Sequence, residues 1–532
     1  MRIKTRRLSL KLNYILLLIS ISILISISLL TLNCLEEKPQ LKNPDVLIDL
    51  SIADAITLDP ADAYEASSIN IIQNIYDRLV TYNGSDISKV TPMVAESWNV
   101  SEDGLKYTFK IRKGIKFTNG NPLNASAVKF SIDRAIIMNR PPAMKLIELV
   151  DSTRVIDDYT FEIKLKRAYP AFLKLLAFSV ASIVDPEVVN AHGGVKANEI
   201  NEFMASNAIG SGPYKLVSWE RGQQIVLEAN EDYWRGKPKI KRYIYKIVPE
   251  PATQMMILEK GDADLAYIPL ANLKELENKS GIVVESGGLS LQIDFIVFNN
   301  NLKPFDSKLV RQAICYAFDY KAAIKNVYYN QAEIARGPIP MGMFGHDDSL
   351  EWYTRDLARA KALLKQAGYE NFTAEIIYLE GNDEMRKTAI LLQDNLREIG
   401  IELKIQPLAY SAYISKIFNK DFQLALAGWA PDFPDPDGNV AFLLHPNSEV
   451  NYASYSNPVV TELIEEGARE LNETTRLQIY SKIQRLVKED APYLWIAQYK
   501  IVGVYRTWVK GYYYNPVTTA SGMRDLFALS KE

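Results

Sequence analysis

Residues 92–134 read PMVAESWNVSEDGLKYTFKIRKGIKFTNGNPLNASAVKFSIDR, and this stretch predicts one compact supersecondary unit. Tyr107, Phe109 and Ile111 alternate with polar residues, which is the period of a half-buried strand. Turn residues stand on both sides of this strand, at 101–104 and at 119–122. Asn124 then occupies the N-cap position of a predicted helix over 125–134.

The residues of this stretch resemble the signature of the family 5 extracellular solute-binding proteins. The chain departs from that signature at Ala127, where the family usually has Asp, and at Asn119, where an acid is common. Further segments match family motifs in the right order: IYDRLV at 75–80, GSGPY at 210–214, NEDYWRG at 230–236, FNNNLKPFDSKLVRQAICYAFDYKAA at 298–323 and GWAPDFPDPD at 428–437. The resemblance therefore covers nearly all of the chain after its N-terminus.

The resemblance implies an α/β fold of the two-lobed periplasmic-binding-protein type (type II, cluster C) with an extra inserted domain. Applied to this sequence, it predicts lobe I at 45–88, 212–288 and 505–532. It predicts the inserted domain at 89–211 and lobe II at 289–504. Strands near 290–299 and 495–505 are predicted to cross between the lobes and to act as the hinge.

The residue pattern from Leu291 onward predicts alternating strands and helices. Strands are expected at 292–298, 374–379, 401–405, 422–427 and 493–498, with helices at 309–328, 356–368, 384–399, 413–419 and 474–489. Gly368 and Gly400 mark two helix ends. A strand–helix–strand rhythm predicts a largely parallel sheet covered by helices.

The residue pattern of the N-terminus is typical of an export signal or a membrane anchor. Residues 1–13 hold five basic side chains and no acid, and 14–33 are uncharged and mostly apolar up to Cys34. Three interpretations remain open: an uncleaved anchor helix, a lipidated Cys34, or a cleaved signal. A polar linker at 34–44 follows. In all three cases the body of the protein is exported and faces the outside of the cell membrane.

Composition narrows the class of protein. The net charge is −3, and the part beyond the basic segment is near −8, which argues against nucleic acid as a partner. About 500 exported residues are too many for one core, so several domains are expected. The second cysteine, Cys315, lies in an apolar helical pattern and is predicted to be a buried thiol without a disulfide.

The sequence shows no constellation typical of an enzyme. Three histidines, His192, His346 and His445, are far apart, and no nucleophile elbow, phosphate loop or zinc motif is present. We therefore expect a binding protein, with no cofactor and no bound metal.

The acidic loop 429–437 is the leading candidate for a binding site. It follows a predicted buried strand and so lies at the strand's carboxyl end, where ligands bind in open α/β sheets. Trp429 would offer a flat apolar wall, and Asp432 a fixed anion for an amine. The plainer alternative is a solvated acidic turn. In peptide-binding members of the resembled family, the acid matching Asp432 pairs with the peptide's α-ammonium.

Four further residues are candidates. The early loop lines the cleft in the resembled family, and the 210–214 turn lies where the predicted insert rejoins lobe I. Tyr64 is a candidate wall and Glu65 a second anion, while Ser211 and Gly212 would offer backbone groups. For Glu65 a solvated loop acid is the stronger alternative, and for the 210–214 turn a tight structural turn is the stronger alternative. Arg336 and Arg386 are named as possible partners of a peptide carboxylate, without a signal that separates them from other arginines.

The resemblance implies the substrate-binding receptor of an ABC importer. We expect a monomer that captures di- or oligopeptides between its lobes and delivers them to a permease and ATPase complex, while its N-terminus holds it at the membrane. Oligosaccharides and nickel chelates are the alternative ligands, and a sensor without transport is the alternative role.

Overall fold

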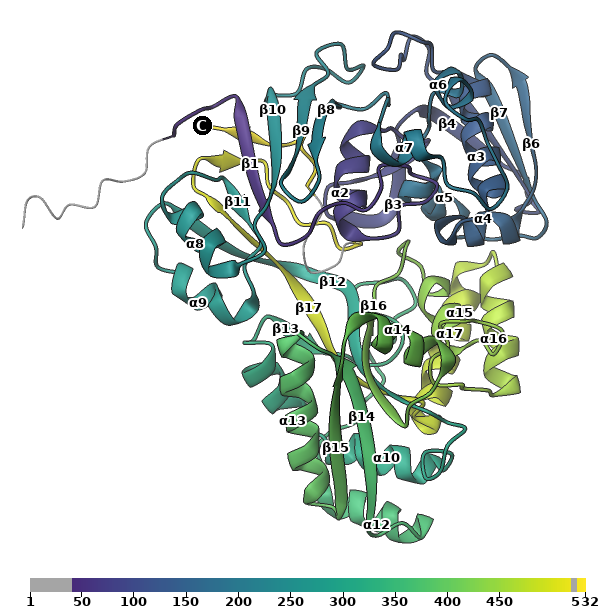
Figure 1. The fold of residues 1–532 in the computed structure, drawn as a ribbon. Coiled ribbons are helices and arrows are strands. Elements are labelled where there is room, and N and C mark those ends of the chain that lie inside the picture. The colour runs from purple at the N-terminus through teal and green to yellow at the C-terminus, as the bar shows by residue number, and fades with distance from the viewer. Residues whose placement is uncertain (1–40, 518–523) are drawn as a thin grey trace, which may run out of the picture. The chain divides into compact units, whose positions relative to one another are not determined.

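The computed structural model describes residues 41–517 and 524–532. The basic segment 1–13, the apolar segment 14–33, Cys34 and most of the linker lie outside the described residues. Within the described residues, none of the helices is both long enough and apolar enough to cross a membrane. Residues Lys42–Glu532 form one compact unit, and everything below concerns this unit (Figure 1).

A mixed sheet of 11 strands runs through both lobes, in the order β15-β14-β16-β12-β17-β11-β1-β10-β9-β8, with β13 paired to β17. Its strands are β1 (Val46–Ser51), β8 (Tyr214–Glu220), β9 (Gln224–Ala229), β10 (Arg242–Ile247), β11 (Leu265–Ala266), β12 (Ile282–Phe298), β13 (Ala332–Ile334), β14 (Phe372–Leu379), β15 (Ile401–Leu408), β16 (Leu424–Trp429) and β17 (Tyr493–Arg506).

Two long antiparallel strands, β12 and β17, connect the lobes, as the sequence predicts. β12 has 17 residues, which is about 55 Å of extended chain. The pairing shifts register between Ser286 and Ile293, midway along β12. A side chain at Gly288 would collide with the Tyr514 ring. The ladder is therefore irregular where it passes between the lobes (Figure 1).

The prediction of a largely parallel sheet is wrong. Parallel pairing occurs where β1 meets β10 and β11 and where β14 meets β15 and β16. The two crossing strands are antiparallel to each other and β12 is antiparallel to β16, so the middle of the sheet is antiparallel. The order of elements along the chain does not reveal the direction of strands that return from the other lobe.

The opening stretch of the sequence folds as predicted. Its strand β5 (Lys106–Ile111) buries Tyr107, Phe109 and Ile111 and exposes the residues between them more fully. It lies in a four-stranded antiparallel sheet with β4 (Ala95–Val100), β6 (Val150–Asp157) and β7 (Thr160–Leu165). Asn124 caps α3 (Ala125–Met138), because its side chain accepts hydrogen bonds from the Ser126 and Ala127 amides.

One predicted helix, 309–328, is broken. Helix α10 (Lys308–Ala317) ends at Phe318, whose backbone is extended. Asp319 then caps a new turn, α11 (Tyr320–Ala322), by accepting from the Ala322 amide at 2.9 Å. A short polar side chain that bonds its own backbone competes with helix continuation, and the apolar periodicity hides this break. Cys315 is buried in α10, as predicted, and burial raises the pKa of its thiol.

The other helices cover the sheets from outside. They are α2 (Ala66–Ile75), α4 (Met144–Leu149), α5 (Phe172–Leu175), α6 (Pro186–Ala191), α7 (Glu202–Ser206), α8 (Pro251–Glu259), α9 (Leu273–Leu276), α12 (Leu357–Ala367), α13 (Asp383–Arg397), α14 (Tyr410–Asn419), α15 (Asp437–Leu444), α16 (Pro458–Arg469) and α17 (Glu473–Asp490). Short strand pairs complete the fold: β2 (Val80–Asn83) with β3 (Asp86–Pro92), and β18 (Val509–Lys510) with β19 (Ser530–Lys531).

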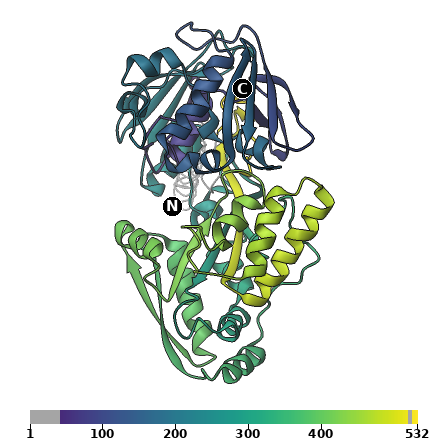
Figure 2. The same cartoon turned by 90° about the vertical axis from the view of Figure 1, so that its right-hand side faces the viewer.

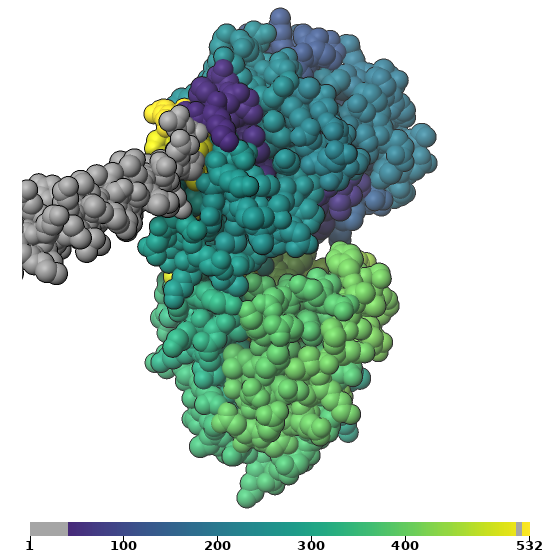
Figure 3. Space-filling view, turned by 60° about the vertical axis from the view of Figure 1, so that its left-hand side comes forward, coloured from purple at the N-terminus to yellow at the C-terminus, as the bar shows by residue number. Residues whose placement is uncertain are grey.

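The elements divide into two lobes, which Figure 3 shows meeting at a notched waist. Apolar cores fill segment 89–211, the two faces of the sheet in lobe II, and lobe I; the core of segment 89–211 also includes Leu79 and Val80 of lobe I and Phe433 of lobe II. Segment 89–211, the predicted insert, is called the insert segment below. Figure 2 shows it, in blue, above the yellow-green helices α15–α17 of lobe II.

Candidate ligand-binding site

The acidic loop lies at the junction of the lobes, at the carboxyl end of β16 as predicted. β16 is held between β12 and β14, and its first four residues are buried. The chain then turns through 430–436 and enters α15 at Asp437. Three aspartates, Asp432, Asp435 and Asp437, follow one another along this loop, and each meets a different partner.

Asp432 meets Tyr64, which comes from lobe I. The Tyr64 hydroxyl donates to Asp432 Oδ2 at 3.0 Å, and the Tyr64 ring packs edge-on against Phe178. Among the described residues, Asp432 Oδ1 has no hydrogen-bond donor. Burial raises the pKa of Asp432 to about 7, although the Tyr64 hydrogen bond pulls it downward. Asp432 is thus a partly buried acid with acceptor capacity left open.

Asp435 is fully paired inside the protein. Both of its oxygens accept from Arg476 of α17, at 2.6 and 2.9 Å, and Asp435 is 1% exposed. Lys174 of the insert segment lies 3.9 Å away. This bidentate ion pair holds the middle of the loop against lobe II.

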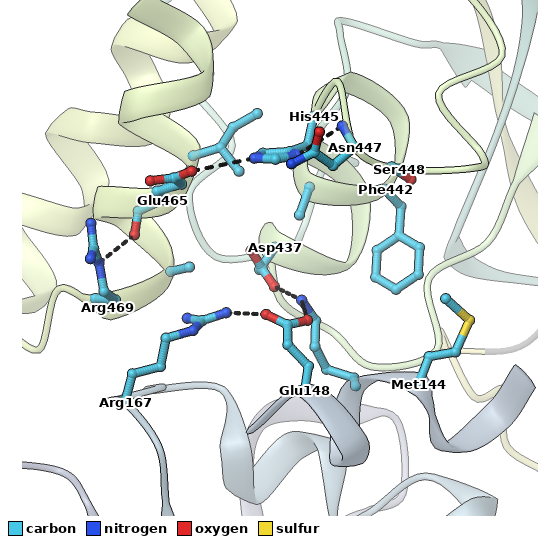
Figure 4. Close-up of a pocket in the computed structure, with 14 residues that line it drawn as sticks. Met144, Glu148, Arg167, Asp437, Phe442, His445, Asn447, Ser448, Glu465 and Arg469 are labelled. Atoms are coloured by element: carbon cyan, nitrogen blue, oxygen red, sulfur yellow. Dashed lines mark hydrogen bonds and ion pairs between the residues drawn. The ribbon is translucent and has the colours of Figure 1, made fainter. Parts of the chain in front are cut away.

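Asp437 joins lobe II to the insert segment. The Tyr169 hydroxyl donates to its Oδ2 at 2.6 Å, and the Lys145 ammonium lies 3.1 Å from the same oxygen. Burial alone would raise the pKa of Asp437, but these two partners outweigh it and hold that pKa below its usual value. Figure 4 shows Asp437 at the floor of an outer cavity of about 630 Å³, beside the Arg167–Glu148 ion pair.

Two further cavities lie on either side of Lys174. The Asp432 cavity, of about 100 Å³, is lined by Asp432 and otherwise by lobe I and the insert segment. The Met341 cavity, of about 840 Å³, is lined by Met341, Met343, Phe344, Leu289, Asp435 and neighbours from both lobes. Lys174 lines both cavities, and its ammonium donates to the Pro434 carbonyl at 2.8 Å. Lys174 thus links the insert segment to the acidic loop between the Asp432 cavity and the Met341 cavity.

Trp429 and Glu65, which were also predicted as site residues, make their hydrogen bonds within the protein. Trp429 lines none of these cavities; its indole donates to the Gly438 carbonyl and its ring packs on Phe442. Glu65 caps α2 and accepts from the Ile56 and Ser68 amides. These bonds disfavour Glu65 as an anion for a ligand, because its carboxylate already holds two backbone donors.

The 210–214 turn is likewise structural in its contacts. The Ser211 hydroxyl donates to Asp77, and the Gly212 amide donates to the Ile75 carbonyl at 2.8 Å. A side chain on Gly212 would collide with the Ile75 backbone. Close packing of the turn against α2 therefore explains this glycine. The roles of Ser211 and Gly212 toward a ligand stay predictions.

The two arginines named from the sequence lie at exposed positions. Arg386 pairs with Asp383 one turn earlier on α13, and Arg336 follows β13. Neither lines the cavities described above. Within 41–517 and 524–532, no group of three or more histidine, cysteine or acidic side chains is arranged to hold a metal ion.

Several residues of this junction were missed by sequence reasoning. Lys145, Tyr169 and Lys174 belong to the insert segment, and Arg476 to α17, so each is far along the chain from the loop it contacts. An arginine or a lysine in a helix is common in any soluble protein. The available signal was the loop itself, since three closely spaced acids need cationic or hydroxyl partners when they are buried.

Comparison with known proteins agrees with this architecture. The chain is 30% identical over 482 residues to the probable D,D-dipeptide-binding periplasmic protein DdpA of Escherichia coli, covering 89% of this chain and 92% of the relative. It is 31% identical over 481 residues to heme-binding protein A of Haemophilus influenzae, covering 85% and 86%.

Among solved structures, the ABC transporter-associated periplasmic binding protein DppA from Helicobacter pylori in complex with peptide STSA superposes with a TM-score of 0.79 and 29% identity, over 92% of this chain and 98% of that one. The model of the bacterial extracellular solute-binding proteins, family 5, matches residues 89–451. The two-lobed α/β fold and the resemblance seen in the sequence are thereby confirmed, and the chain belongs to family 5 of the bacterial extracellular solute-binding proteins.

Proposed function

We propose that this protein is the receptor of an ABC importer for peptides and that Asp432 binds the peptide's α-ammonium. The observation that carries the proposal is the state of Asp432: a partly buried carboxylate between the lobes that has one partner and an open oxygen. A DppA structure with bound peptide and a relative named for dipeptides support peptides as the ligand class.

The chemistry of the site favours an amine. A buried carboxylate is costly when charged, and a ligand ammonium relieves that cost by supplying a counter-ion and hydrogen-bond donors. Tyr64 donates to the other oxygen and so holds the carboxylate in place. Peptide capture would involve both lobes, because Asp432 and Tyr64 come from different lobes, and closure about β12 and β17 would complete the enclosure.

The test is calorimetric titration with L-alanyl-L-alanine and its N-acetyl derivative. Asp432→Asn keeps the shape and removes the charge. Loss of one partner of a buried charge pair costs about 2–5 kcal/mol, so dipeptide affinity should fall by about 30-fold or more. The N-acetyl derivative should bind the wild type weakly, and the variant should discriminate less between the two ligands.

Asp421→Asn is the matched control, because Asp421 is an exposed acid of the same lobe that pairs with Lys416. It should bind both ligands as the wild type does. The peptide proposal fails at its central contact if Asp432→Asn retains wild-type affinity for the free dipeptide. A panel of oligosaccharides and nickel chelates is then the next measurement, and binding of one of them would identify the alternative ligand class.

The transport partners follow from the family. The closed, liganded protein would bind to a permease that is driven by an ATPase. Co-purification with such a complex from solubilised membranes tests this step. A receptor that binds peptide but supports no uptake in cells would instead be a sensor.

The N-terminus would tether the protein outside the cell membrane, through segment 14–33 or a lipid on Cys34. Full-length protein should partition with membranes, and a chain beginning near Pro39 should not. Cys34→Ser separates the two anchors: retention on the membrane supports a helix, and release supports a lipid. Recovery of the intact full-length chain from the soluble fraction would contradict both.

A further inference from the structure

Lobe II is joined to the insert segment by apolar side chains. Phe433 of the acidic loop is 1% exposed and belongs to the apolar core of the insert segment, together with Ala468 of α16. The Phe433 ring packs edge-on against Tyr169, with 6.4 Å between the ring centroids. Leu471, just after α16, lies so close to Gly104 that a side chain there would meet it at 3.0 Å. Separating lobe II from the insert segment would expose this apolar surface to water, which is unfavourable.

The same contact contains a buried ion pair. Asp437 of lobe II binds the Tyr169 hydroxyl and the Lys145 ammonium, both from the insert segment. The Lys145 side chain is 10% exposed, and its ammonium also lies 3.0 Å from Glu148 and 5.6 Å from the centre of the Phe442 ring. Burial alone would lower the pKa of Lys145, but Asp437 and Glu148 outweigh it and raise that pKa. Figure 4 shows Glu148 of the insert segment facing Asp437 and Phe442 of α15.

The insert segment is also anchored to lobe I. Arg134 of α3 binds both oxygens of Asp59, and the two side chains are 2% and 1% exposed. The Ile183 amide donates to the Asp77 carbonyl at 2.9 Å. Both ends of the segment continue directly into lobe I. A hinge movement about β12 and β17 would therefore carry the insert segment with lobe I and separate it from lobe II.

We propose that the insert segment holds lobe II in the closed position through Phe433 and the Lys145–Asp437 ion pair, independently of any ligand. Lys145 and Asp437 line the outer cavity and neither the Asp432 cavity nor the Met341 cavity. A contact that exists only in the closed state shifts the open–closed equilibrium by its own free energy, with or without a ligand. A bound ligand would leave only as fast as this contact opens. The inference rests on the proposed function only where it concerns ligand release.

The first test is small-angle X-ray scattering of the ligand-free protein. Lys145→Met keeps an unbranched side chain and removes the charge, so Asp437 would be buried without a cation in the closed state and solvated in the open one. The radius of gyration of this variant should therefore exceed that of the wild type. Lys145→Arg keeps the charge and should stay closer to the wild type; it also decides the question if Lys145→Met does not fold.

The second test is the rate at which L-alanyl-L-alanine is released, followed by tryptophan fluorescence after rapid dilution. Lys145→Met should release the dipeptide at least ~10-fold faster than the wild type, because loss of one partner of a buried charge pair acts mainly on dissociation. Lys110→Met is the matched control in both tests, since Lys110 is a lysine of the insert segment that bonds Thr160 within the same segment. Its scattering curve and its release rate should equal those of the wild type.

The outcomes distinguish this inference from the proposed function. If folded Lys145→Met and the wild type scatter alike without ligand, the insert segment does not hold the lobes closed, whatever ligand the protein binds. A variant that expands but releases the dipeptide at the rate of the wild type would overturn the control of ligand release. If no peptide binds the wild type, the proposed function itself is wrong, while the scattering of the ligand-free proteins still decides whether the insert segment holds lobe II closed.

Discussion

The two halves of the acidic loop differ in how completely their acids are paired. Asp435 and Asp437 have buried cationic partners, Arg476 in lobe II and Lys145 in the insert segment. Asp432, three residues before Asp435, has the Tyr64 hydroxyl alone among described residues. All three acids lie in one short loop stiffened by Pro434 and Pro436.

This difference teaches how one loop serves two purposes. The second half holds its position because every buried charge has a counter-charge. The first half contains Asp432, whose pKa is raised. Carboxylates with shifted pKa values are common at binding sites. The half with Asp435 and Asp437 would hold the half with Asp432 in position. Substitutions in the first of these should therefore lower stability, and substitution of Asp432 should lower ligand affinity.

The largest expected effect is loss of stability from Asp435→Asn. Removing one member of a buried ion pair leaves Arg476 charged and uncompensated, which costs about 3–5 kcal/mol. Urea denaturation of the ligand-free protein measures this change. Asp432→Asn is the comparison and should show no such loss at pH 8. Equal stability of the two variants would remove the distinction between the halves of the loop.

The next effect concerns the pH dependence of peptide binding. Because the pKa of ligand-free Asp432 is about 7, the acid must lose a proton before it pairs with an ammonium. Dipeptide affinity should therefore fall by about tenfold for each pH unit below 7. It should also fall above about pH 8, where a peptide's own ammonium loses its proton. Titrations between pH 5 and 9 measure this curve.

The same shift has a consequence for stability. The folded pKa of Asp432 is raised above the unfolded value, so the ligand-free wild type should lose stability as the pH rises from about 4 to about 7. Asp432→Asn should lack this loss and should be the more stable protein at pH 8. Parallel stability profiles of the two proteins over this range would show that Asp432 is not desolvated.

A smaller effect is expected from Tyr169→Phe. The change removes the hydroxyl that donates to Asp437 and leaves Lys145 as its partner. A hydrogen bond to a charged group contributes about 1.5–3 kcal/mol, and urea denaturation should show a loss in that range. Tyr410→Phe, at an exposed tyrosine of lobe II, is the control and should be neutral. A neutral Tyr169→Phe would mean that Lys145 alone satisfies Asp437.

The smallest effect on stability, and the most specific effect on function, is expected from Lys174→Met. The change removes the hydrogen bond from Lys174 to the Pro434 carbonyl, which lies between the Asp432 cavity and the Met341 cavity. Affinity for hexa-alanine should rise relative to L-alanyl-L-alanine, because the longer peptide gains the Met341 cavity. Calorimetry with both peptides measures the ratio. An unchanged ratio would show that Lys174 does not limit ligand length.

Much of the fold was predictable from local pattern. The strand with Tyr107 and Phe109, the cap at Asn124 and the buried Cys315 follow from periodicity and side-chain chemistry within a few residues. The break at Asp319 and the antiparallel middle of the sheet were not predicted. A helix break by a capping side chain and the direction of a returning strand depend on contacts outside the local window.

The candidate site divides in the same way. The sequence alone determined that Asp432 belongs to an acidic loop at the end of a buried strand, because that inference needs only a strand and the residues after it. Only the tertiary structure decided which acids are paired and that Tyr64 of lobe I meets Asp432. Their partners lie from 41 to 368 residues away along the chain. The energy of a buried charge depends on what surrounds it in space and not on its neighbours in sequence.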